Sequence, residues 1–169
     1  ASSAGNHAQG VALGAKMNGI EATIVMPQTA PLAKVTATKS YGANVVLEGL
    51  VYDDAYAKAL EIQKETGATF LHPFNDEYVI AGQGTIALEI FEQMNSKVDT
   101  ILCPIGGGGI IAGVAVAAKA LNPNVKIIGV QTANIPSMHE SMKAGKVTTA
   151  FKATSVADGI SVKTVGELT

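Results

Sequence analysis

Several residue types that define whole classes of protein are scarce in this sequence. Among its 169 residues there is no tryptophan and only one cysteine, and aromatic residues make up 5%. A single cysteine, Cys103, cannot form an internal disulfide, which argues against a disulfide-stabilised secreted domain and favours a cytoplasmic protein. Because Cys103 lies in the apolar run Ile101-Leu102-Cys103, we expect it to be a buried, reduced residue without a chemical role.

Charge of either sign is also sparse. The 12 lysine and arginine residues nearly balance the 14 aspartate and glutamate residues, and the formal net charge is −2 at pH 7. No cluster of basic residues offers an electrostatic footprint for nucleic acid or an anionic membrane surface. The longest strongly apolar stretch, 110–121, contains Lys119 and is shorter than the roughly 20 residues that a transmembrane helix needs. We therefore expect neither nucleic acid nor a membrane as a partner.

What the sequence does contain is an alternation of short β-rich runs and segments with helical periodicity. This pattern is typical of an α/β protein with open, mainly parallel sheets and flanking helices. We expect helices near 8–18, 31–41, 53–66, 78–94, 110–121 and 136–144. We expect strands near 22–26, 44–48, 68–71, 99–103 and 126–131. Turn-forming residues at 71–76 favour a boundary there, so 1–73 and 74–169 are predicted to form parts of two lobes.

The strongest local signal for binding is a run of four glycines. Gly106, Gly107, Gly108 and Gly109 follow the predicted strand at 99–103 and precede a predicted helix that begins at Ile110. A strand, a turn without side chains and a helix N-terminus direct backbone N–H groups at one point, where the helix dipole also favours an anion. Because consecutive glycines cost conformational entropy, a purely structural tight turn is the less favoured alternative. The sequence therefore predicts a phosphate site at this tetraglycine turn.

The residues alone leave open which phosphate compound binds there. Gly107, Gly109 and Ala112 match the Gly-x-Gly-x-x-Ala form of a dinucleotide-binding turn. However, the acidic residue that such sites place after the next strand is replaced by Gln131, which disfavours a nicotinamide cofactor. The sequence also lacks the Gly-x-x-x-x-Gly-Lys motif, followed by serine or threonine, of nucleoside-triphosphate sites.

A second segment suited to ligand binding stands at the start of the sequence. Residues 2–10, Ser-Ser-Ala-Gly-Asn-His-Ala-Gln-Gly, combine small residues, hydroxyls, an amide and an imidazole just before a predicted helix. Small residues let the backbone approach a ligand, and a helix N-terminus again suits an anion. By composition, a helix cap and a ligand site fit this segment equally well.

Together, five segments resemble those of one known family. They are Ser3-Ala4-Gly5-Asn6-His7-Ala8-Gln9-Gly10, Pro27 after Ile24-Val25-Met26, Ala81-Gly82-Gln83-Gly84-Thr85, the tetraglycine turn, and Ala157-Asp158-Gly159-Ile160. They occur in the same order in the threonine dehydratases, also called threonine ammonia-lyases, which are pyridoxal-phosphate enzymes of fold type II. The resemblance extends through essentially the whole sequence, and the joint order is far more specific than any single segment.

The resemblance implies roles for particular residues. Those implied to bind pyridoxal phosphate are Asn6, Gly106, Gly107, Gly108, Gly109, Ile110 and Gly159. In this scheme the Asn6 amide contacts the phenolic oxygen of the ring, the tetraglycine turn and the Ile110 N–H hold the phosphate, and Gly159 approaches the ring face. Ser3, Gly5 and His7 are implied to hold the carboxylate of an amino-acid substrate. The implied protein is a homo-oligomer that converts L-threonine or L-serine to a 2-oxo acid and ammonia.

Departures from the family bear on the alternatives. Serine racemases carry a serine, the second acid/base, where this sequence has Ala4, so the resemblance favours a dehydratase over a racemase. Cysteine synthases usually have threonine in place of His7. Gln131 stands where some relatives have an acidic ligand of a divalent metal, so we expect no metal site.

The lysine that forms the family's Schiff base is missing from this sequence. In the family it lies in a Ser-Phe-Lys-like segment upstream of the asparagine loop, and none of the lysines at 16, 34, 39 and 58 has that context. The family's serine or cysteine partner of the pyridine nitrogen lies downstream of the position of Thr169. We therefore expect an internal fragment without a catalytic residue of its own. A non-catalytic module that binds phosphate or supports oligomerisation is the alternative from another class.

Overall fold

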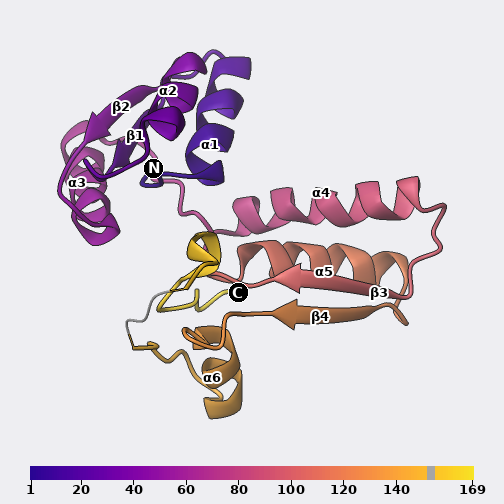
Figure 1. Cartoon of the computed structure of the whole chain (residues 1–169). Helices are drawn as coiled ribbons and strands as arrows, with labels where there is room; N and C mark the ends of the chain where they lie inside the picture. Colours follow the sequence, from indigo (N-terminus) through magenta and orange to yellow (C-terminus); the bar gives the residue numbers. More distant parts are fainter. Residues whose placement is uncertain (152–154) are drawn as a thin grey trace. The chain divides into compact units, whose positions relative to one another are not determined.

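The computed structural model describes residues 1–151 and 155–169, which form two compact units (Figure 1). The first unit is Ala1–Pro73 and the second is Phe74–Thr169, so the division falls inside the turn-rich segment 71–76. Each unit contains a pair of parallel strands flanked by helices. The predicted α/β class with parallel sheets is confirmed.

In the first unit, helices cover both faces of the strand pair. Strand β1 (Thr23–Met26) pairs in parallel with β2 (Asn44–Leu47), and the helices are α1 (Asn6–Met17), α2 (Leu32–Ser40) and α3 (Tyr52–Thr66). Because side chains alternate along a strand, Ile24 and Met26 share one face, where they pack with α1 and α2, while Val25 packs against α3 on the other. These three side chains of β1 are almost completely buried.

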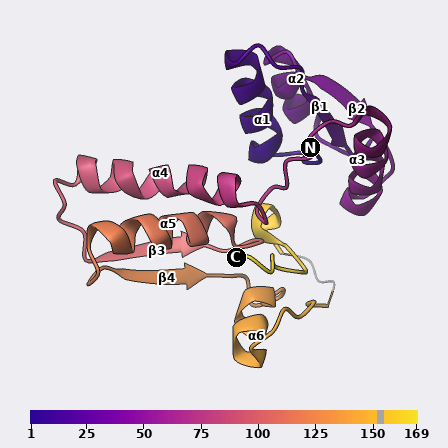
Figure 2. The same cartoon turned by 180° about the vertical axis from the view of Figure 1, so that it is seen from behind.

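The second unit is built around a second parallel pair and two closely packed helices. Strand β3 (Thr100–Pro104) pairs with β4 (Lys126–Val130), and the helices are α4 (Glu77–Gln93), α5 (Gly109–Leu121), α6 (Ser137–Ala144) and the 3-10 turn η1 (Asp158–Ile160). Helices α4 and α5 lie side by side in both views (Figures 1 and 2). Glycines allow this approach, since a Cβ on Gly113 would lie 2.7 Å from the Gly84 nitrogen. No helix in the described part of the chain is long and apolar enough to cross a membrane.

Helix α4 shows how local sequence sets an element. Asp76 accepts hydrogen bonds from the N–H groups of Tyr78 (2.9 Å) and Val79 (3.0 Å), a cap that contributes about 1 kcal/mol to helix stability. Its apolar stripe buries Ala87 and Phe91 in the core of the second unit, as the periodicity of 78–94 predicts.

The predicted strand at 68–71 is wrong, because these residues form no strand in the structure. The aromatic residue there, Phe70, packs instead against the α3 cluster, with its ring edge-on to Tyr56 at a centroid distance of 5.5 Å. A short apolar run in the sequence indicates that the segment is buried. It does not indicate whether a neighbouring strand is present to complete the hydrogen bonds of a strand.

Cys103 lies in β3 and is 3% exposed. It is a free cysteine, and burial raises the pKa of its thiol, which disfavours the reactive thiolate. The predicted burial of Cys103 is confirmed.

Candidate functional site

The opening loop is held against β1 and leads directly into α1. The Ser3 N–H donates to the Val25 carbonyl (3.2 Å), and Ser2 forms a parallel bridge with the same residue. Helix α1 begins at Asn6, slightly earlier than predicted, with Gly5 as its N-cap residue and no side-chain cap. The loop therefore sets the N-terminus of a 12-residue helix, where the dipole suits an anion, beside the sheet of the first unit.

The predicted substrate-binding residues lie together at this helix start. The Ser3 hydroxyl accepts a hydrogen bond from the Gly5 N–H (3.2 Å), and no acceptor for its own proton is found among the residues that the structure describes. The side chain of Asn6 is exposed, and a Cβ added to Gly5 would meet no heavy atom within 4 Å. Space for a ligand is therefore present where Gly5 and Asn6 face outward.

His7 is anchored within the first unit. Its Nε2 lies 3.1 Å from the carbonyl oxygen of Leu71. Because a carbonyl only accepts, Nε2 carries the proton and donates to Leu71. This bond fixes the orientation of the ring and commits one of its two nitrogens to the segment just before Pro73.

The tetraglycine turn joins β3 to α5 at the carboxyl end of the second sheet. The ladder extends one residue beyond β3, where the Ile105 N–H donates to the Val130 carbonyl (2.8 Å). Gly108 then adopts φ +102° as the N-cap residue of the 13-residue α5. Within the described residues, the backbone N–H groups of 106–110 donate no hydrogen bond. The turn thus presents unsatisfied donors at a helix N-terminus, as the sequence predicts for an anion site.

Two glycines of the turn pack against a residue that the sequence did not single out. A Cβ on Gly107 would overlap the ring of Phe74, and one on Gly109 would lie 2.9 Å from the Phe74 α-carbon. Phe74 stands in a turn-rich segment, and no periodicity or motif in the sequence points to this contact. Glycine is therefore required at 107 and 109 by the packing of the protein itself.

The other two glycines of the turn, Gly106 and Gly108, lie close to residues of the C-terminal segment. A Cβ on Gly108 would lie 2.6 Å from the hydroxyl oxygen of Thr169, which donates to the Gly107 carbonyl (2.8 Å). A Cβ on Gly106 would lie 3.2 Å from a methyl carbon of Val162. The glycine content of the turn consequently does not separate a phosphate site from a tight turn, whereas its unsatisfied N–H groups do.

Gly159 lies beside the turn but faces open space. Its carbonyl oxygen would lie 3.8 Å from a Cβ on Gly106, so the structure brings 159 and the tetraglycine turn together. A Cβ on Gly159 itself would meet nothing within 4 Å. The second unit therefore combines anion-suited donors with a bare backbone surface that a flat group could approach. Asn6, Ser3, Gly5 and His7 belong to the other unit.

Within the described residues, no group of three or more histidine, cysteine, aspartate or glutamate side chains could hold a metal ion. The Oε1 of Gln131 accepts from the N–H groups of Met138 (3.0 Å) and His139 (3.2 Å). The expected absence of a metal site stays a prediction.

Comparison with known proteins places these features in one family. The whole chain, residues 1–169, matches the family model described as pyridoxal-phosphate dependent enzyme. The chain is similar to an L-threonine ammonia-lyase of Thermotoga maritima, with 57% identity over 100% of this chain and 42% of that protein.

Two solved structures are similar throughout the chain. The processed form of threonine deaminase isoform 2 from Solanum lycopersicum has a TM-score of 0.92 and 44% identity, covering 98% of this chain and 46% of that one. A maize serine racemase has a TM-score of 0.92 and 42% identity, covering 99% of this chain and 50% of that one. The chain spans about half the length of the curated relatives it matches, 42% and 48% for two of them.

Proposed function

The chain belongs to the family of pyridoxal-phosphate-dependent enzymes, and from this premise we propose that it is part of a lyase acting on L-threonine and L-serine. The reaction is dehydration and deamination to a 2-oxo acid and ammonia. The observation that carries the proposal is the 57% identity with an L-threonine ammonia-lyase across 100% of the chain. The likeness to a threonine deaminase, at a TM-score of 0.92, supports the same reaction.

The second unit has the features that pyridoxal phosphate requires. The cofactor combines a phosphate group with a flat ring, and when bound it serves as an electron sink for the substrate's α-carbon. Unsatisfied N–H groups at the start of α5 suit the phosphate, and the open space at Gly159 suits the ring. We assign phosphate binding to Gly106, Gly107, Gly108, Gly109 and Ile110, and the approach to the ring face to Gly159.

The first unit has the features that an amino-acid carboxylate requires. The N-terminus of α1 favours an anion, the Ser3 hydroxyl has a proton to donate, and the room at Gly5 admits a ligand close to the backbone. We assign Ser3, Gly5 and His7 to the substrate carboxylate and the Asn6 amide to the cofactor ring. Since the His7 Nε2 proton is given to Leu71, this proton is not available to the substrate while that bond persists.

The two units are proposed to be parts of the two lobes of the family fold. Residues 1–73 would belong to the small lobe and 74–169 to the large lobe, a scheme supported by the division after Pro73. The proposal also includes a homo-oligomer in the cytoplasm. Large apolar side chains that are highly exposed, such as Leu32 (79%) and Val116 (71%), are typical of surfaces that further protein covers.

Serine racemisation is the second candidate, favoured by the likeness to the maize racemase. A racemase needs acid/base groups on both sides of the α-carbon. Ala4 stands where racemases carry their serine, and its methyl group packs against the apolar cluster of the first unit. A methyl group neither donates nor accepts a proton, so this position favours the lyase.

Product analysis separates the candidates. The full-length protein that carries this chain is incubated with L-serine and L-threonine, and 2-oxo acid, ammonia and D-serine are quantified, the last by chiral chromatography. We expect 2-oxo acid and ammonia with little D-serine. D-Serine formed as fast as pyruvate would replace the lyase with a racemase. Cofactor-loaded protein that forms neither product would support the non-catalytic phosphate-binding module.

A further inference from the structure

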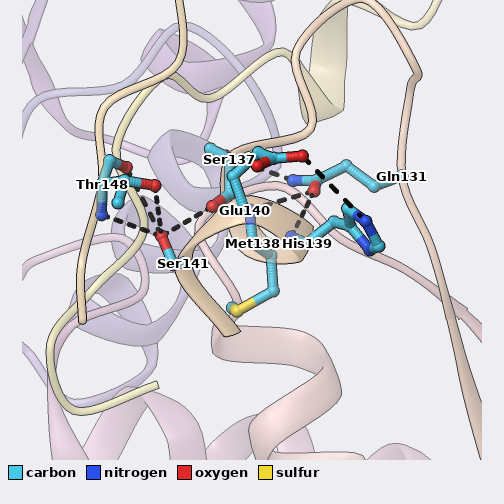
Figure 3. Close-up of polar contacts among 7 residues, drawn as sticks. All are labelled: Gln131, Ser137, Met138, His139, Glu140, Ser141 and Thr148. Carbon is cyan, nitrogen blue, oxygen red and sulfur yellow. Dashed lines mark hydrogen bonds and ion pairs between the residues drawn. The ribbon is translucent and has the colours of Figure 1, made fainter. Parts of the chain in front are cut away.

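A connected set of hydrogen bonds in the second unit joins Gln131 to residues of α6 (Figure 3). Gln131 follows β4 directly, and Ser137 is the first residue of α6. The Gln131 Nε2 donates to the Ser137 hydroxyl (3.2 Å) and, at the long distance of 3.5 Å, to the Ile105 carbonyl. The Ser137 hydroxyl in turn donates to the Val162 carbonyl (2.7 Å). We call this connection, from Ile105 through Gln131 and Ser137 to Val162, the Gln131–Ser137 brace.

The amide of Gln131 has only one orientation that satisfies these contacts. Its Oε1 accepts from two backbone N–H groups at the start of α6, Met138 and His139, and these groups can only donate. The Nε2 must therefore face Ile105 and Ser137, where it uses both of its protons. All hydrogen-bonding positions of the amide are occupied, so the side chain is held rigidly.

The two ends of the brace, Ile105 and Val162, lie next to the tetraglycine turn and the Gly159 segment. Ile105 immediately precedes Gly106, the first residue of the tetraglycine turn. Val162 closely follows Gly159, and its methyl carbon would lie 3.2 Å from a Cβ on Gly106. The brace thus links the donors proposed for the phosphate to the segment proposed for the ring.

Helix α6 is also held by buried serines and by hydrogen bonds to the segment that follows it. Ser137 is completely buried, and Ser141, one turn later, is 7% exposed. The Ser141 hydroxyl donates to the Ser137 carbonyl (2.6 Å) and accepts from the Thr148 N–H (2.9 Å). Within the described residues, the Ser141 hydroxyl bonds to Ser137 and Thr148 and not to Ile105 or Val162, so Ser141 is a matched control on the same helix.

We propose that Gln131 and Ser137 are positioning residues, which hold the tetraglycine turn and the Gly159 segment at a set separation before pyridoxal phosphate binds. The inference rests on the proposed cofactor site and adds two residues that touch neither the cofactor nor the substrate. A ligand that contacts both segments binds more tightly when they are already ordered, because less conformational entropy is lost on binding.

The brace requires a neutral amide at 131. A glutamate there would still accept from the two N–H groups of α6, so the first turn of the helix would keep both of these hydrogen bonds. A carboxylate has no proton to donate, however, and would draw the Ser137 hydroxyl proton away from the Val162 carbonyl. Gln131→Glu therefore cuts both ends of the brace while preserving the size of the side chain and the start of α6.

The test measures how the full-length protein binds pyridoxal phosphate at a temperature where every variant is folded. Gln131→Glu and Ser137→Ala are compared with Ser141→Ala and the unmodified protein, all in the presence of a metal chelator. Dissociation constants come from titration, and the circular dichroism of the bound cofactor reports how its ring is held. Melting temperatures record the stability that each substitution costs.

We expect about tenfold weaker binding and an altered cofactor dichroism in Gln131→Glu and Ser137→Ala, the size of effect that follows from losing roughly one net hydrogen bond. Ser141→Ala should lower the melting temperature but leave the dissociation constant and the dichroism unchanged. Equal affinity in all four proteins, or losses of affinity that simply follow melting temperature across all three variants, would overturn the brace. If the unmodified protein bound no pyridoxal phosphate, both the proposed function and the brace would be overturned.

Discussion

Glycine has different surroundings in the two units of the chain. At Gly5, in the first unit, an added Cβ would meet nothing within 4 Å. At Gly107, in the second unit, it would overlap the ring of Phe74. A crowded glycine is explained by the protein's own packing, so its presence says little about a ligand. Packing does not explain the glycine at position 5, and the proposed substrate site gives a reason for a small residue there.

Gly159 follows the pattern of Gly5 although it lies next to the crowded turn. A Cβ added to Gly159 would meet nothing within 4 Å. A Cβ added to any glycine of the tetraglycine turn would lie within 3.2 Å of another residue. The glycine content of the turn is therefore less informative about binding than its unsatisfied N–H groups are. Substitutions at Gly5 and Gly159 add a side chain without a clash, so they separate ligand binding from folding.

The largest expected effect is the complete absence of stoichiometric lysine labelling by pyridoxal phosphate in both units. Neither contains a lysine in the family's Ser-Phe-Lys-like context, so the 169 residues should not be labelled at a single lysine when incubated with pyridoxal phosphate and reduced with borohydride. Peptide mapping by mass spectrometry measures the labelling. Stoichiometric modification of one lysine, with a matching absorbance band, would contradict the prediction and place a cofactor-bearing lysine in this chain.

Next in size is the effect of filling the crowded turn. Gly107→Ala should lower the free energy of unfolding by about 1–3 kcal/mol, since the new methyl group overlaps the Phe74 ring. Chemical denaturation followed by circular dichroism measures it in the full-length protein. Gly82→Ala, in α4 with open space around it, is the control and should be neutral or stabilising.

A double variant tests the cause. Removing the ring with Phe74→Ala should make Gly107→Ala much less damaging than it is alone, since the two residues are in contact. Strictly additive losses in the double variant would show that Phe74 is not the reason for glycine at 107.

A smaller effect is expected where glycine faces open space beside the turn. Gly159→Ala should leave stability unchanged but weaken the affinity for pyridoxal phosphate by about tenfold, because the methyl group would crowd the ring face. Titration of the full-length protein measures the dissociation constant. Gly145→Ala is the control: Gly145 has φ +66° with open space, so alanine there costs stability without touching the site. Undiminished affinity in Gly159→Ala would remove this residue from the cofactor site.

The smallest effect is expected in the first unit. Gly5→Ala should raise the KM for L-threonine severalfold and leave cofactor affinity unchanged, because the methyl group would enter the space assigned to the substrate carboxylate. Steady-state kinetics of the full-length protein measure the change. Gly14→Ala, in the middle of α1 with open space around it, should leave KM as it is. A cofactor affinity that fell together with KM in Gly5→Ala would erase the distinction between the two regions.

Most of the secondary structure could be predicted because its signals are local. The segment 78–94 has an apolar stripe and an N-terminal Asp76, and α4 forms at Glu77–Gln93. The apolar run at 22–26 likewise becomes β1 (Thr23–Met26). The same reasoning failed at 68–71, since a run of this length cannot reveal whether a neighbouring strand is present.

The sequence by itself determined the alternation of strands and helices, the glycine turn at a strand–helix junction, and the resemblance to one enzyme family. Each of these depends on neighbouring residues or on the order of segments. Only the tertiary structure decided which atoms surround each glycine and what Gln131 contacts. Gln131 bonds to Ile105, which is 26 residues away in the sequence, and Ser137 bonds to Val162, which is 25 residues away. Such contacts are set by how helices and strands pack, because packing brings together residues whose local patterns carry no information about each other.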